Sequence, residues 1–148
     1  MILTSSAFKN NESIPRKHTC DGGDINPELL IQYVPEGTES LALIVDDPDA
    51  PNGTFVHWLV FNVASKTTSV KEESVPAGSI EGMTSFGKIG YGGPCPPQGK
   101  PHRYFFKLYA LDVPRLPEFG TLPNKATLEA AMKGHIIESA ELIGLYKR

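Results

Sequence analysis

The sequence predicts a mainly β domain of the β-sandwich type that closes with a helix and a strand near its C-terminus. Three stretches rich in β-branched and aromatic residues predict the main strands, at residues 40–45, 55–63 and 102–111. The gaps between these stretches carry proline and glycine, most densely at residues 87–101. Short strands separated by turn residues are typical of two packed sheets.

The remaining elements carry weaker signals. Residues 2–8 and 29–34 are minor strand candidates. Residues 125–133 are good helix formers, with Asn124 as an N-cap that can accept a backbone N–H bond and Gly134 just past the end. Residues 136–146 fit either a helix or a strand, and we favour a terminal strand because Gly144 and the β-branched residues weaken a helix.

The bulk composition indicates one domain that spans residues 1–148. The chain is 40% hydrophobic and 21% charged, as in ordinary globular proteins. Its net charge of −3 gives no support to a nucleic-acid partner. No apolar run approaches the roughly 20 residues of a membrane span, and the start lacks the apolar core of a signal peptide. We therefore expect a cytoplasmic protein with no stable membrane insertion.

The two cysteines, Cys20 and Cys95, lie far apart in the sequence and fit no zinc or redox motif. We expect two reduced thiols. A disulfide between them is the alternative, in an oxidising compartment or in a hyperthermophile.

Strand alternation brings chemically useful side chains together on the stretch 102–111. His102, Tyr104 and Phe106 share one face, so a polar pair stands at the start of an otherwise apolar face. That pattern is typical of the mouth of a pocket. His57 shares a face with apolar neighbours such as Phe55, where a lone histidine is more often a hydrogen-bonded core residue than a ligand contact.

Three carboxylates follow the apolar stretch 40–45, at Asp46, Asp47 and Asp49. Asp and Pro favour turns, so a turn is one interpretation. Asp47 and Asp49 would point the same way in extended backbone, and a carboxylate beside an imidazole stabilises the imidazolium. Imidazolium, phenol and free backbone N–H groups suit a phosphate or carboxylate ligand, so the second interpretation is an anion site.

Other chemistries find less support. The glycine-rich stretch 87–93 is neither a dinucleotide fingerprint nor a P-loop. The acidic and histidine residues named above contain no local pair with metal-ligand spacing, so we expect neither a metal nor another cofactor. Cys95 and His102 are the only candidate pair of nucleophile and base. The prolines on both sides of Cys95 favour a rigid structural position for it instead.

Several of these motifs resemble the phosphatidylethanolamine-binding protein family. They are DDPDAP at 46–51, the stretch around His57, GGPCPP at 92–97 and PHRYFFKLYALD at 101–112. TCDGGDINPEL at 19–29 and AELIGLYKR at 140–148 extend the likeness over nearly the whole chain, and the short bacterial and archaeal branch is the most similar. The resemblance implies a large antiparallel sheet packed on a smaller sheet, a helix near the C-terminus and a small anion pocket at the surface.

The resemblance also implies which residues form that pocket and how the loop beside it is built. It implies a cis bond between Ala50 and Pro51. The long C-terminal segment that partly covers the pocket in eukaryotic members is absent, which predicts an open pocket. The implied ligand-binding residues are Asp47, Asp49, Pro51, His57, Gly93, Pro94, Pro96, Pro97, His102 and Tyr104.

Three functions follow as hypotheses. The first, which we favour, is non-enzymatic binding of a small anionic or phosphorylated ligand, such as a phosphoethanolamine-like head group, phosphate or a nucleotide, in a regulatory role. The second is inhibition of a protease or kinase by protein–protein contact, which rests on analogy alone. The third is a hydrolase that uses Asp and His for acid–base chemistry. The same analogy suggests a homodimer.

Overall fold

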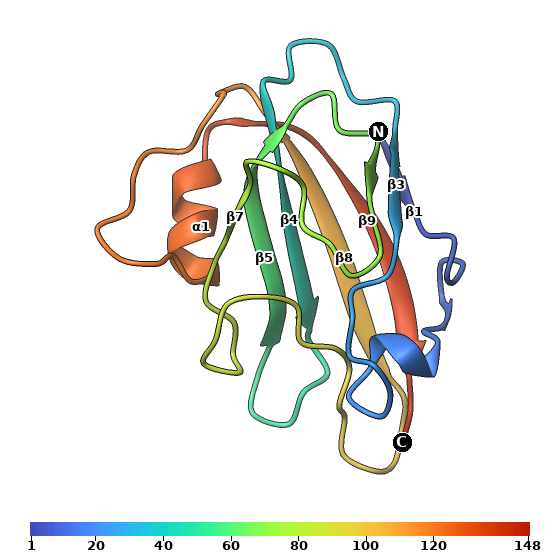
Figure 1. The fold of residues 1–148 in the computed structure, drawn as a ribbon. Coiled ribbons are helices and arrows are strands. Elements are labelled where there is room, and N and C mark those ends of the chain that lie inside the picture. The colour runs from blue at the N-terminus through green and yellow to red at the C-terminus, as the bar shows by residue number, and fades with distance from the viewer.

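The computed structural model describes residues 1–148 as a large sheet with a small sheet on one face and a helix on the other (Figure 1). The elements in chain order are β1 (Ile2–Thr4), β2 (Glu12–Ser13), the short 3-10 helix η1 (Arg16–His18), β3 (Leu29–Gln32), β4 (Ser40–Asp47), β5 (Phe55–Ala64), β6 (Ser69–Val70), β7 (Ile80–Glu81), β8 (His102–Leu111), α1 (Lys125–Met132) and β9 (Ile136–Tyr146). The fold class predicted from the sequence is confirmed.

The large sheet has the strand order β2-β9-β8-β4-β5-β7, and the small sheet has the order β1-β3-β6. All neighbours run antiparallel except β2 and β9, which are parallel. The predicted large antiparallel sheet thus has one parallel pair, at this edge. Parallel neighbours need a long connection, and here nearly the whole chain separates the two strands.

Strand β4 is buried on both faces, and its alternation divides the core into two layers. Leu41, Leu43 and Val45 pack toward the small sheet. Ala42 and Ile44 pack on the opposite face, where the core includes residues of α1. Burial on both sides explains why β4 reads as a continuous apolar run. The central strands thus form a rigid platform, and the loops at their ends take their positions from it.

The helix α1 confirms the predicted capping signals. The Asn124 side chain accepts a bond from the Thr127 backbone N–H at 3.0 Å, and the Thr127 hydroxyl accepts the Asn124 N–H at 2.9 Å. Gly134 follows the end with φ +85°, a conformation that costs a side-chain-bearing residue energy. With eight residues, α1 is short, and no helix of the structure has the length and apolarity to cross a membrane.

The strand predictions differ from the structure mainly at the periphery. The stretch 102–111 coincides with β8, and 136–146 is the strand β9. The stretch 2–8 is wrong beyond Thr4, because the Ser5 hydroxyl accepts the Ala7 N–H and makes a local turn that competes with the sheet. The two-residue strands β2, β6 and β7 were not predicted, since two residues carry no periodic signal.

Candidate functional site

A cavity of about 430 Å³ opens at the end of the large sheet where β4 passes to β5 and where β8 begins. This end of the sheet is in the lower part of Figure 1. Segments far apart in the sequence meet there, because antiparallel pairing brings the end of β4 beside the starts of both neighbours. The predicted residues that line it are Asp47, Pro51, His57, Pro96, Pro97 and His102.

Asp47 and His102 form a hydrogen-bonded pair at the cavity wall. The His102 Nδ1–H donates to Asp47 Oδ2 at 2.7 Å, and the Asp47 side chain is almost fully buried. The other carboxylate oxygen accepts the Asp49 backbone N–H at 2.7 Å, so Asp47 also shapes the turn that follows β4. With Nδ1 engaged, only Nε2 of His102 remains for a ligand. Asp47 thereby orients the ring and can stabilise a positive charge on it.

His57 faces the same cavity from β5. Its Nδ1–H donates to the carbonyl of Gly92 at 2.7 Å, while the Gly92 N–H donates to the His57 carbonyl at 3.0 Å. Burial lowers the pKa of His57 below 6.5, with the hydrogen bond to Gly92 acting in the opposite direction. At pH 7 the ring is therefore neutral, and its Nε2 atom carries a lone pair. His57 is therefore the hydrogen-bonded core histidine of the first sequence hypothesis, and it also lines the cavity.

Tyr104 lies behind His57 rather than on the cavity wall. It shares the face of β8 with His102, as strand alternation predicts, but the residue is only 1% exposed. Its ring meets the His57 ring edge-on, with centroids 5.2 Å apart. Burial raises the pKa of Tyr104, and the negative charges of Asp47 and Asp49 add to that effect. The hydroxyl therefore stays protonated, and the buried ring packs against the ring of His57.

Asp49 turns away from the cavity, although the sequence places it with Asp47. Both of its oxygens bind the Arg103 guanidinium at 2.9 Å, and one oxygen also accepts the Arg103 backbone N–H. These bonds lower the pKa of Asp49 to about 2. Arg103 alternates with His102 and so faces the other side of β8, and Asp49 goes with it. This carboxylate fixes the acidic loop onto the start of β8.

Asp46 lies on the opposite face of β4 from Asp47, as alternation requires. It is fully buried, and one oxygen binds Lys125 Nζ at 2.8 Å and Lys107 Nζ at 3.2 Å. The other oxygen has no hydrogen-bond partner. Because Lys125 begins α1, this carboxylate ties the helix to the large sheet.

The loop wall around residues 92–97 is fastened to the segment that follows η1. Cys20 and Cys95, expected to be reduced, are joined in a disulfide. The Cys20 N–H donates to the carbonyl of Pro94 at 3.1 Å, and the Gly93 N–H donates to Asp24 Oδ1 at 2.7 Å. Gly93 and Pro94 form these two hydrogen bonds and do not line the cavity, whereas Cys95 lines it. The wall therefore has a cavity side and an anchored side.

Two aromatic residues of the cavity were not among the predicted site residues. Phe86 stands edge-on to Phe55 and to His57, with ring centroids 4.8 and 5.4 Å away. A Cβ at Gly92 would lie 2.3 Å from the Phe86 ring, so that glycine makes room for it. Alternation had placed Phe55 on the face of His57, which was a usable signal. No sequence pattern pointed to Phe86, because it lies in a loop without periodicity.

The acidic loop contains no cis bond, so the implied cis bond between Ala50 and Pro51 is wrong. The trans form of such a bond is favoured by about 0.5–1 kcal/mol when nothing opposes it. Here Gly53, at φ +102°, completes the reversal with an N–H bond to the Ala50 carbonyl. No group of three or more His, Cys, Asp or Glu side chains is arranged to hold a metal ion.

Comparison with known proteins gives a consistent picture. Residues 4–147 match the family model described as phosphatidylethanolamine-binding protein. The chain is 49% identical to a UPF0098 protein of Aquifex aeolicus, over 100% of this chain and 89% of that protein. It is 48% identical to a UPF0098 protein of Pyrococcus horikoshii, over 99% of this chain and 77% of that protein.

Two solved structures are similar over nearly their full length. One is a phosphatidylethanolamine-binding protein homologue from Chlamydia trachomatis, with a TM-score of 0.93, 41% identity and coverage of 99% of this chain and 97% of that chain. The other is YbcL of E. coli, described as a member of the mammalian family, with a TM-score of 0.92, 34% identity and the same coverage. Fold and sequence thus agree on one family.

Proposed function

The chain belongs to the phosphatidylethanolamine-binding protein family, and from that premise we propose that it binds a small anionic group, a phosphate ester above all, in the cavity between His57 and His102. The observation that carries the proposal is the pairing of two imidazoles on one cavity. Each ring has its Nδ1 atom committed to the protein, to Gly92 or to Asp47, and each has Nε2 free of protein partners.

The protonation of His57 decides how an oxyanion can be held. A neutral ring presents a lone pair at Nε2, and a lone pair repels an anionic oxygen. Binding therefore needs one proton between the ring and the ligand. A phosphate ester can bring that proton, because its second pKa is about 6, or His57 can take one up as the anion arrives. Above pH 6, where the free ester is mostly a dianion and the free His57 ring is neutral, the complex in both routes holds one more proton than the separate partners.

The rest of the cavity suits an organic remainder on the anion. Its volume of about 430 Å³ falls in the range of roughly 300–1,000 Å³ that small-molecule sites occupy. Beyond the histidines, the walls include two aromatic rings, Phe55 and Phe86, and three prolines, beside small and polar residues. Prolines keep such a wall ordered before the ligand arrives, which lowers the entropy cost of binding. An ester with an apolar or flat substituent fits these walls better than bare phosphate.

Removing the His102 side chain is expected to weaken phosphate-ester binding at least tenfold. A charge-assisted hydrogen bond contributes about 1.5–3 kcal/mol, and the variant also leaves Asp47 buried without its partner. Isothermal titration of His102→Ala with phosphoethanolamine at pH 6 measures the change. His135→Ala is the matched control, because His135 also pairs with an aspartate, Asp112 at 2.9 Å, but lies outside the cavity. Equal affinities for the two variants would contradict the proposal.

The affinity for anions is expected to fall by about tenfold per pH unit between pH 6 and 8. The sign follows from the lowered pKa of His57, because the free ring is neutral above 6.5 and must gain a proton on binding. Sulfate and phosphoethanolamine should be compared at constant ionic strength. Sulfate has no proton to bring in this range, so its slope reports proton uptake by the protein alone. An affinity that stays flat from pH 5 to 8 would contradict this prediction and would show that groups without a titration in this range, such as backbone N–H groups, carry the binding instead.

A further inference from the structure

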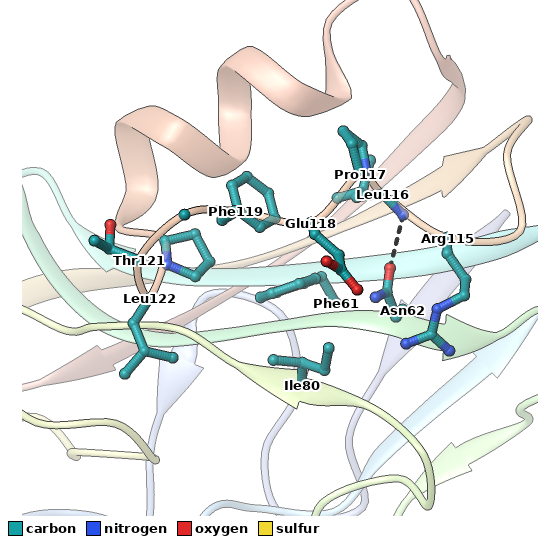
Figure 2. Close-up of a pocket in the computed structure, with 12 residues that line it drawn as sticks. Phe61, Asn62, Ile80, Arg115, Leu116, Pro117, Glu118, Phe119, Thr121 and Leu122 are labelled. Carbon is teal, nitrogen blue, oxygen red and sulfur yellow. Dashed lines mark hydrogen bonds between the residues drawn. The ribbon is translucent and has the colours of Figure 1, made fainter.

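A second cavity, of about 440 Å³, lies between the far end of β5, strand β7 and the segment 115–123 that precedes α1 (Figure 2). It shares no residue with the cavity between the two histidines. Its size also falls in the range of roughly 300–1,000 Å³ that small-molecule sites occupy. Nothing in the proposed anion binding uses it.

A β-bulge in β5 builds the floor of this second cavity. Two residues, Phe61 and Asn62, stand opposite a single residue of β4, and Asn62 takes a φ of +55°. The Asn62 side-chain oxygen accepts the Leu116 N–H at 2.9 Å, as the dashed line in Figure 2 marks. Its amide NH₂ group has no protein partner. A bulge redirects side chains, and here it turns both residues toward the segment 115–123.

Two opposite charges flank that amide. Figure 2 shows the Glu118 carboxylate and the Arg115 guanidinium on either side of Asn62. Neither side chain makes a hydrogen bond or an ion pair within the protein, whereas Asp47 in the first cavity is hydrogen-bonded to His102. The local net charge is zero, so the site complements neither a simple anion nor a simple cation. It complements a ligand that carries one charge of each sign.

The remainder of the second cavity is apolar. Phe61 and Phe119 meet edge-on with ring centroids 5.6 Å apart. Ile80 and Leu122 are 37% and 51% exposed, which is a high fraction for large aliphatic side chains. A ligand body seated against these four side chains would remove apolar surface from water, which is favourable at about 25 cal/mol per Å².

We propose that this second cavity binds a small zwitterion with an apolar body, of the class of the free α-amino acids with aromatic or branched aliphatic side chains. The ligand carboxylate lies against Arg115 and the Asn62 amide, and its ammonium group lies against Glu118. The side chain of the ligand packs between Phe119, Ile80 and Leu122. The proposal is independent of anion binding at the two histidines.

The test is a titration of the ¹⁵N-labelled protein with L-phenylalanine up to 20 mM, followed by amide chemical shifts at residues 61–62 and 115–123. We expect saturable shifts confined to those residues. N-acetyl-phenylalanine lacks the ammonium charge and phenylalanine amide lacks the carboxylate, so each should bind at least tenfold more weakly. L-leucine should compete with L-phenylalanine, and glycine should not.

Two charge-removing variants sharpen the test. Arg115→Gln is expected to remove the preference for phenylalanine over its amide, and Glu118→Gln the preference over the N-acetyl form. Arg16→Gln and Glu36→Gln are matched controls at exposed positions outside the cavity, and both should keep the preferences of the parent protein. The absence of saturable shifts at 20 mM would overturn the proposal. Equal binding of all three phenylalanine forms would overturn the assignment to a zwitterion.

Discussion

Replacing Cys20 and Cys95 together with alanine is expected to lower the free energy of unfolding by about 4 kcal/mol. The disulfide joins residues 75 positions apart, and in the chain-entropy model a cross-link of that span removes about that much freedom from the unfolded chain. For a chain of this length, the loss corresponds to a drop in melting temperature of roughly 10 °C. Urea unfolding of the oxidised parent and of the double variant measures the difference directly.

Reduction of the parent protein supplies the control for this prediction. The parent in strong reductant should approach the stability of the double variant, while the variant itself should not respond to reductant. A difference below about 1 kcal/mol between oxidised parent and variant would mean that the unfolded chain is already constrained in this region. Because Cys95 lines the first cavity, anion affinity should be measured on the same samples.

Adding one methyl group at Gly93 is expected to cost about 3 kcal/mol, the upper end of the range for overpacking. A Cβ there would lie 2.2 Å from the carbonyl oxygen of His18 and 2.9 Å from the Cα of Thr19. These are backbone atoms, held by the hydrogen bonds of Cys20 and Gly93 across the same junction, so they cannot move aside as a flexible side chain can. The cavity wall must therefore shift, and anion affinity should fall with stability.

Gly120→Ala is the matched control for that substitution. No atom lies within 4 Å of a Cβ built at Gly120, and its φ is not in the left-handed region. Denaturant unfolding should show a change below about 0.5 kcal/mol for Gly120→Ala. If Gly93→Ala were equally benign, the loop and the segment after η1 would have to separate freely, and the wall would not be anchored as the structure indicates.

The parts of the site that the sequence could predict are those that follow from strand alternation. The period of two pairs His102 with Tyr104 and puts Phe55 beside His57, and both pairings hold in the structure. The same rule, applied one residue further, would have separated Arg103 from His102. That separation could have led to the prediction of an ion pair between Asp49 and Arg103, which places Asp49 away from the cavity.

The parts that could not be predicted depend on contacts between distant loops. The joining of Cys20 to Cys95 requires two irregular segments to meet, and no local pattern in either segment encodes that meeting. The same holds for Phe86, whose position depends on the absence of a side chain at Gly92. The bulge at Asn62 is likewise invisible in a stretch that reads as a regular strand. Tertiary packing decides all three.

The place of β8 in the large sheet has a consequence for synthesis on the ribosome. β4 pairs with β5 and β8, but β8 begins only at residue 102 and β4 is complete at residue 47. At a synthesis rate of roughly 5–20 residues per second, the intervening chain takes about 3–11 s to make. During that time, the edge of β4 that will pair with β8 has unpaired backbone N–H and C=O groups. An apolar strand with such an edge can pair with other chains. The nascent protein therefore passes through a state in which a chaperone that covers apolar strands has a defined target, and that target disappears when β8 docks.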